Sequence, residues 1–334
     1  MEPSNLALFW AGVIAMAILL YVVLDGFDLG VGVLFGTTKE EAYRVRMLDT
    51  IAPFWDGNET WLVVIGAGLF AAFPDVYAVF LGAFYIPVLL LLLGLIFRGV
   101  AFEFRFRSGP MRPFWDRGFF YGSVVVAFVQ GAAVGAMLRG IPVTNGQYAG
   151  SPLGWLHPFP ILTGIGLVLG YALLGAGWLV LKSDGELRDW AYARVRVLAI
   201  SVLVVLFLAF AVTFDYSVLA RIDWQARRWG LVFPVLGALA LTGLAIGVHR
   251  KRHDGVPFAM TVIFFIAAYL TLGVMLWPYM IPYSITVAQA ASPDVSLRFL
   301  FYGGVVVLPV IAVYTIGVYW VFRGKVRKGY GQGA

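Results

Sequence analysis

Long apolar runs constrain the fold of this chain more than any other feature of its sequence. A bilayer core about 30 Å thick is crossed by about 20 apolar residues in a helix. With 61% hydrophobic and 13% charged residues, the chain carries more apolar surface than a water-soluble core can bury. We therefore predict an all-α polytopic membrane protein. Its nine transmembrane helices are expected near residues 6–36, 48–73, 76–104, 118–139, 158–182, 194–216, 229–248, 257–283 and 299–322.

A faint internal repeat suggests how these helices are organised. The segment that begins at Tyr21 resembles the segment that begins at Tyr171, an offset of about 150 residues. Because four helices separate the copies, both run in the same direction. We predict one integral membrane domain over residues 1–334, with two pseudo-symmetric four-helix bundles (6–139 and 158–283) and a peripheral ninth helix (299–322). Chance similarity between apolar segments is the alternative explanation.

The distribution of basic residues predicts the orientation of the chain. When alternate loops are assigned to opposite sides, 19 of the 24 Lys and Arg residues, Arg98 among them, fall on one side and 5 on the other. The positive-inside rule then places the N-terminus outside and the C-terminus in the cytoplasm. This asymmetry accounts for the net charge of +6 without a nucleic-acid partner.

Acidic residues inside the apolar runs are the strongest functional candidates. Asp25 and Asp28 lie three positions apart in the first predicted helix, Asp56 and Glu59 three apart in the second, and Glu103 near the end of the third. An ionisable group in the bilayer is costly unless it is paired, hydrated or neutral. The first two helices contain no interior Lys or Arg to neutralise their acids. Since desolvation favours the protonated carboxyl, we predict a proton entry path in the cytoplasmic half of the membrane.

Less demanding explanations exist for several of these acids. Asp25 and Glu103 could lie in the headgroup region at helix ends, and Glu103 could pair with Arg107 one turn later. Asp28 and Glu59 could cap a helix or pair locally. The remaining acids of interest are expected to be solvated loop charges: Asp116, Asp184, Glu186, Asp189 and Asp254.

The histidines and cysteines bear on cofactor binding. The chain has no cysteine, and its three histidines, His157, His249 and His253, fall in predicted loops or at membrane edges. A haem buried in a bilayer requires axial His, Met or Cys ligands inside the bundle. We therefore expect this chain to ligate no haem and no metal ion. Tryptophans such as Trp55 and Trp61 fit an interfacial belt or contacts with a partner.

Four sequence blocks resemble a known family. They are residues 24–30 (LDGFDLG), 51–61 (IAPFWDGNETW), 96–103 (IFRGVAFE) and 277–282 (WPYMIP). Together they resemble subunit II of the cytochrome bd-type quinol oxidases, and the resemblance extends over essentially the whole chain. The compact loop between the sixth and seventh predicted helices, with the block around Glu103, is similar to the cyanide-insensitive branch.

The resemblance implies a respiratory heterodimer in the bacterial cytoplasmic (inner) membrane that oxidises quinol and reduces dioxygen to water. It implies that haem b and haem d, or a variant of haem d, lie in the partner, subunit I. In the family, subunit II supports that partner and supplies carboxylates for cytoplasmic proton uptake. These carboxylates match Asp25, Asp56 and Glu103, where better-known members carry aspartate at the last position. Neighbouring candidates complete the set: Asp28, Asn58 and Glu59 for proton transfer, and Trp55, Gly57 and Trp61 for packing or partner contact.

The expected partners are the haem-bearing subunit I, quinol and lipids, with small accessory membrane subunits as a further option. Some family members also bind a structural quinone in subunit II. Two other classes of function remain open from the residues alone. A proton-coupled secondary transporter also combines repeats with membrane acids, and it would be active without a partner. A passive assembly subunit would use its carboxylates only to hydrogen-bond the partner.

Overall fold

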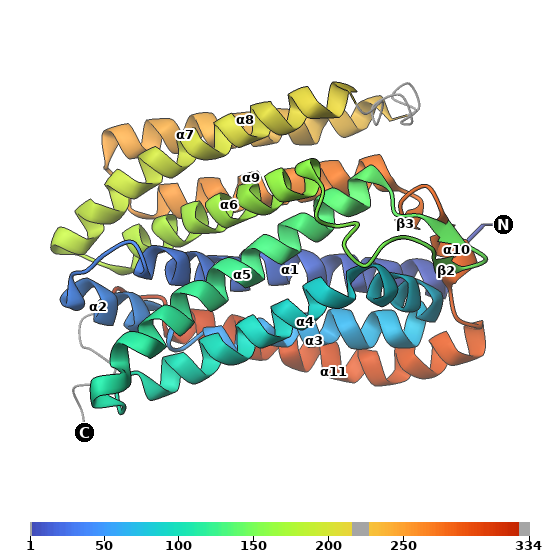
Figure 1. Cartoon of the computed structure of the whole chain (residues 1–334), viewed down its shortest axis with the longest axis horizontal. Helices are drawn as coiled ribbons and strands as arrows, with labels where there is room; N and C mark the ends of the chain where they lie inside the picture. Colours follow the sequence, from blue (N-terminus) through green and yellow to red (C-terminus); the bar gives the residue numbers. More distant parts are fainter. Residues whose placement is uncertain (1, 216–226, 327–334) are drawn as a thin grey trace.

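The computed structural model describes residues 2–215 and 227–326, and most of them form helices that run along one long axis (Figure 1). The long helices are α1 (Asn5–Phe35), α3 (Trp55–Ala72), α4 (Pro74–Phe104), α5 (Arg112–Arg139), α6 (Pro158–Lys182), α7 (Gly185–Asp215), α8 (Val232–Arg250), α9 (Gly255–Leu276) and α11 (Asp294–Val321). The short elements are α2 (Glu41–Ile51), α10 (Val287–Ala290), the 3-10 turns Gly109–Met111 and Arg228–Leu231, and the strands β1 (Val143–Thr144), β2 (Gln147–Tyr148), β3 (Tyr279–Ile281) and β4 (Ile285–Thr286).

Within the described residues, eight helices are long and apolar enough to cross a membrane. They comprise all the long helices except α3, which has 18 residues and carries Asp56 and Glu59 in its first turns. The polytopic character of the chain is therefore confirmed, whereas a ninth span formed by α3 stays a prediction. The sidedness of the chain also stays a prediction, and three residues of its charge count, Arg221, Arg327 and Lys328, lie outside the described residues.

Two predicted helices are broken by turns in the structure, and two others begin earlier than predicted, at Arg112 and Gly185. The run predicted at 48–73 is interrupted at residues 52–54, so its first residues belong to the end of α2 and α3 begins at Trp55. The run predicted at 257–283 ends at Leu276, and Pro278 leads into the antiparallel pair β3 and β4. Proline has no backbone N–H to continue a helix, which explains the second correction.

Helix α1 lies between the two sides of the molecule. It packs against α3, α5 and α6, while α7 and α8 lie on one side and α3, α4 and α11 on the other (Figure 1). In the first half α1 pairs with α3 and α5, and α5 pairs with α4. In the second half α6 pairs with α7 and α9, and α9 pairs with α8. The two halves thus contain corresponding helix pairs; their division into two bundles stays a prediction.

The contact between α1 and α6 is close because glycines remove side chains from it. A β-carbon added to Gly30 would lie 1.7 Å from the carbonyl oxygen of Tyr171, and one added to Gly175 would lie 2.4 Å from the carbonyl carbon of Gly30. Small residues let two helix backbones approach in this way. The crossing buries the neighbouring part of α1, including Asp25 and Asp28.

Candidate functional site

A buried ion cluster joins three helices. Arg98 of α4 places its Nη1 atom 3.3 Å from Oδ1 of Asp25 on α1 and 2.5 Å from Oε1 of Glu59 on α3. The side chains of Asp25 and Arg98 are 0% and 1% exposed, whereas that of Glu59 is 24% exposed. Of these three side chains, Glu59 alone reaches the surface of the chain, so the cluster has an outer and an inner carboxyl.

An amide links the second acid of α1 to the last long helix. The Nδ2 group of Asn58 donates to Oδ2 of Asp28 at 2.7 Å and to the carbonyl oxygen of Leu24 at 3.1 Å. The hydroxyl of Tyr319, on α11, donates to Oδ1 of Asn58 at 3.1 Å. Asn58 and Asp28 are buried. These hydrogen bonds fix the orientation of the amide, and the amide in turn holds one oxygen of Asp28.

A second amide bridge lies on the other side of α1. Gln130 of α5 donates from Nε2 to the hydroxyl of Tyr21 at 2.9 Å, and the hydroxyl of Tyr171 donates to Gln130 Oε1 at 2.9 Å. Tyr21 lies one helical turn before Asp25 on the same face of α1. The two tyrosines occupy equivalent positions in the sequence repeat, and they meet at one glutamine.

Several buried polar atoms of the cluster have no hydrogen-bond partner within the described chain. They are Oδ1 of Asp28 and Nε and Nη2 of Arg98. The carboxylate of Asp25 interacts with Arg98 and with the hydroxyl of Tyr21. Buried polar groups in proteins are almost always satisfied, by protein or by ordered water. The cluster also contains three carboxyl groups and a single guanidinium. Because excess buried negative charge is strongly disfavoured, this composition suits a site that binds protons.

The structure brings together Asp25, Asp28, Asn58 and Glu59 but leaves Asp56 and Glu103 at the surface of the isolated chain. The first two predicted helices supply no cation for their acids, but a third helix does, because Arg98 of α4 pairs with Asp25 and Glu59. The charge count treated Arg98 as a loop charge. In the structure it lies inside α4 and is 1% exposed. Sequence reasoning missed its role; the available signal was an arginine directly after the apolar run of α4.

The three predicted packing residues lie within or beside the helix contacts of this chain. Trp55 packs on Phe102, with ring centroids 5.3 Å apart. A β-carbon on Gly57 would lie 3.5 Å from the ring of Tyr314, and Trp61 is 6% exposed. These contacts lie inside the chain, and the role of the three residues in packing or in binding a partner stays a prediction.

Two acids expected to be solvated are instead held by cations at helix ends. Asp116 is largely buried and receives Arg105 Nε at 2.5 Å and Arg44 Nη1 at 3.1 Å. Asp254, which precedes α9, pairs with Arg188 Nη2 at 2.7 Å and Lys325 Nζ at 2.5 Å. Both residues therefore tie helix ends together.

The environment of Asp254 changes its proton affinity. Burial alone would raise the pKa of Asp254, but hydrogen bonds from Arg188, Lys325 and Tyr192 outweigh burial and lower this pKa to about 2. The carboxylate is thus stabilised in its charged form, as expected for a structural ion pair.

The histidines remain outside this cluster. His157 immediately precedes α6, His249 lies in the last turn of α8, and His253 lies between α8 and α9. Among residues 2–215 and 227–326, no group of three His, Asp or Glu side chains is arranged to hold a metal ion.

Comparisons with known proteins agree with this architecture. The family model for cytochrome bd terminal oxidase subunit II matches residues 6–322. The chain is 31% identical over 362 residues to cytochrome bd-I ubiquinol oxidase subunit 2 of Escherichia coli K12, covering 97% of this chain and 96% of the relative. It is 32% identical over 337 residues to cytochrome bd ubiquinol oxidase subunit 2 of Bacillus subtilis 168, covering 95% and 96%. A chain of the bd oxidase from Geobacillus thermodenitrificans has the same fold, with a TM-score of 0.75 at 16% identity over 96% of this chain and 99% of that one.

Proposed function

This chain belongs to the family of cytochrome bd terminal oxidase subunit II, and from that premise we propose that it supports the haem-bearing subunit I and conducts protons toward it from the cytoplasm. The observation that carries the proposal is the buried cluster of Asp25, Glu59 and Arg98. Buried ionisable residues in membrane helices mark proton or ion pathways by default.

Side-chain exposure suggests the order in which protons pass. Asp56 is exposed at the start of α3, Glu59 lies one turn further on the same helix and is partly exposed, and Asp25 is fully buried. We place Asp56 at the entrance, Glu59 as the acceptor at the surface of the cluster, and Asp25 as the inner site. Glu103, exposed at the end of α4, is a second candidate for the entrance.

Arg98 has a defined part in this scheme. Its positive charge lowers the free energy of a deprotonated Asp25 or Glu59, because opposite charges attract strongly in a medium of low dielectric constant. A proton that arrives at Glu59 can pass to Asp25 while the guanidinium stays between them, so the net charge of the cluster changes little. Asp28, held by Asn58, extends the series of carboxyls along α1.

The scheme also explains energy conservation without a pump. Reducing one dioxygen to water consumes four protons, and quinol oxidation on the opposite face releases its protons there. Drawing the consumed protons from the cytoplasm moves charge across the membrane, worth about 2.3 kcal/mol per charge per 100 mV. The haems belong to the partner in this proposal, while a structural quinone and accessory subunits remain options for this chain.

The test is Asp25→Asn in the complete oxidase complex. Asparagine keeps the shape of the side chain but cannot carry a proton, so oxygen consumption with quinol should fall at least about a hundredfold, the lower range for a lost proton-transfer group. Haem content and the reduction of the haems by quinol should stay unchanged. Asp56→Asn should have a smaller effect, and Asp75→Asn, an exposed acid at the start of α4, serves as the control.

The outcomes separate the three classes of function. Normal turnover with intact haems would end the proton-path role of Asp25. Loss of haems from the complex would favour the passive assembly role instead. Transport by the purified chain alone would favour the secondary transporter, an activity that the oxidase proposal excludes.

A further inference from the structure

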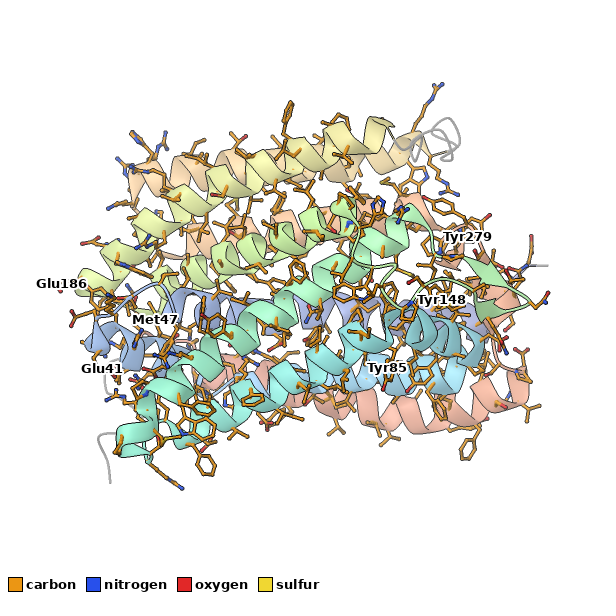
Figure 2. All side chains as sticks on the ribbon, in the orientation of Figure 1. Glu41, Met47, Tyr85, Tyr148, Glu186 and Tyr279 are labelled. Carbon is orange, nitrogen blue, oxygen red and sulfur yellow. The ribbon has the colours of Figure 1, made fainter. Side chains whose placement is uncertain are left out.

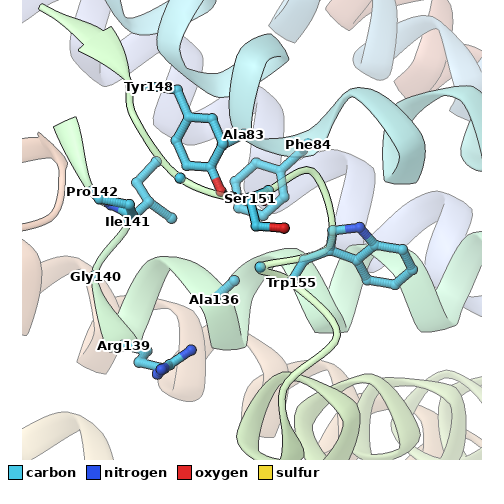
Figure 3. Close-up of a pocket in the computed structure, with 12 residues that line it drawn as sticks. Ala83, Phe84, Ala136, Arg139, Gly140, Ile141, Pro142, Tyr148, Ser151 and Trp155 are labelled. Atoms are coloured by element: carbon cyan, nitrogen blue, oxygen red, sulfur yellow. Dashed lines mark hydrogen bonds between the residues drawn. The ribbon is translucent and has the colours of Figure 1, made fainter. Parts of the chain in front are cut away.

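A cavity of about 330 Å³ lies beside the kink of α4 at Phe84 and the last turn of α5, at the end of the molecule where Tyr148 is labelled in Figure 2. Its walls are formed by α4, α5 and the connection between α5 and α6 (Figure 3). This end is opposite to Glu41 and Glu186 (Figure 2), and the distribution of basic residues predicts that it faces outside. The cavity is separate from the ion cluster described above.

Two polar side chains that line this cavity have a hydrogen available to donate, those of Trp155 and Ser151. Trp155 is 5% exposed, and its indole N–H has no partner within the described chain. Figure 3 shows the five-membered ring of this indole, which carries the N–H, toward the other lining residues and the six-membered ring pointing away. The hydroxyl of Ser151 accepts from the backbone N–H of Leu153 at 3.3 Å, which leaves its own hydrogen available.

The charged side chain that lines the cavity is positive. Arg139, in the last turn of α5, lines it, and the lining contains no Asp or Glu. The hydroxyl of Tyr148 donates its hydrogen to the carbonyl oxygen of Ser151 at 2.7 Å, so Tyr148 is not counted among the donors to the ligand. A buried donor without an acceptor is costly. The ligand that best satisfies these groups is therefore an oxyanion with several acceptor oxygens.

The surroundings favour an oxyanion that is attached to a lipid. The connection that carries Ser151 and Trp155 also exposes Leu153 and Leu156, and the adjoining outer part of α6 exposes Ile161 and Ile165. Exposed apolar side chains next to a tryptophan and an arginine are typical of the membrane interface. We propose that this cavity binds the phosphate of an outer-leaflet phospholipid, with Trp155 and Ser151 donating to it and Arg139 pairing with it.

The experiment uses the complete, delipidated oxidase complex in detergent. Its thermal unfolding midpoint is measured against increasing phosphatidylglycerol, inorganic phosphate or diacylglycerol. Phosphatidylglycerol should raise the midpoint, and the other two should not. In the double variant Trp155→Phe, Arg139→Gln the half-saturating concentration of phosphatidylglycerol should rise at least about tenfold, as expected for losing a charged hydrogen bond.

The matched control is Trp229→Phe, Arg298→Gln, which changes the same residue types at two exposed positions on the predicted outer side; its response should equal that of the natural chain. An equal response of the double variant would overturn the site. An equal effect of inorganic phosphate would overturn the lipid source, and an equal effect of diacylglycerol would overturn phosphate recognition. If the double variant fails to assemble, Arg139→Gln alone, at an exposed residue, is tested by the same titration.

Discussion

Arg98 is the residue on which the buried cluster depends, because its guanidinium is shared by Asp25 and Glu59. An ion pair in a low-dielectric interior gains little over a well-packed apolar pair. Removing one member, however, leaves an uncompensated charge whose cost is several kcal/mol. The cluster is therefore better explained by function than by stability.

The first residue-scale prediction is that Arg98→Met destabilises the complex by about 3–5 kcal/mol, the cost of an unpaired buried charge. Adding Asp25→Asn should recover part of this loss, since the double variant removes the unpaired charge. Thermal unfolding and haem content measure both effects. Arg117→Met, at an exposed arginine of α5, should change neither. If Arg98→Met is as stable as the natural chain, Arg98 does not neutralise Asp25 and Glu59.

The cluster could be predicted from sequence only in part. The cost of burial singled out Asp25 and Asp56, and of these two the structure buries Asp25 alone. The same rule ranked Asp56 above Glu59, whereas the structure buries most of Glu59 and exposes Asp56. Both lie in the first turns of α3, and the rotation of that helix about its axis decides which one faces Arg98. No pattern in a single sequence gives that rotation.

At the scale of elements, the close crossing of α1 and α6 positions the acids of α1. The crossing depends on Gly30 and Gly175, whose missing side chains leave room for the opposite backbone. Packed interiors transmit small displacements, so a shift of α1 here would move Asp25 and Asp28 relative to Arg98.

We expect Gly30→Ala to disrupt this crossing, since its β-carbon would lie 1.7 Å from the carbonyl oxygen of Tyr171. Forcing extra volume into a packed core typically costs about 1–3 kcal/mol, and a backbone contact cannot move aside as a side chain can. The yield and thermal stability of the complex report the effect. Gly12→Ala on the same helix is the control, because nothing lies within 4 Å of its added carbon. Alanine favours a helix more than glycine does, so helix propensity cannot cause a loss in either variant. Similar losses from both variants would therefore contradict a specific role of the crossing.

The long helices could be predicted from the length of their apolar runs. The turns that interrupt these runs could not, because they depend on local backbone chemistry. Eight long apolar helices are present among the described residues. The break between α2 and α3 was missed because residues 52–54 are apolar and hide the end of a helix within a hydrophobic run. The hairpin after Leu276 was missed for the same reason, although Pro278 marks its start.

For the whole molecule, residues 322–326 join the ends of three helices, α11, α6 and α9, at the predicted cytoplasmic side. Lys182, at the end of α6, donates to the carbonyl oxygens of Phe322 and Gly324, and the backbone N–H of Val326 donates to the carbonyl oxygen of Lys182. Lys325 donates to Asp254, just before α9. Residues 322–326 thus connect α11 to α6 and α9, whose partners in turn include α1 and α8.

This connection should weaken in acid, and the pKa of Asp254 determines the pH at which it does so. Its folded pKa of about 2 lies below the value of about 4 usual in an unfolded chain. A lowered pKa stabilises the fold fully above about pH 4, and the contribution disappears as the pH falls through about 2.

Asp254→Asn should therefore lower the free energy of unfolding by about 1 kcal/mol at neutral pH, a small value because the ion pairs of Asp254 are partly exposed. The difference from the natural chain, followed by thermal unfolding, should vanish near pH 2. Glu40→Gln, at an exposed acid of the same end without an ion pair among the described contacts, should give no such difference at any pH. If the difference in stability between Asp254→Asn and the natural chain does not change with pH, packing holds residues 322–326 in place, and the charge of this carboxylate does not.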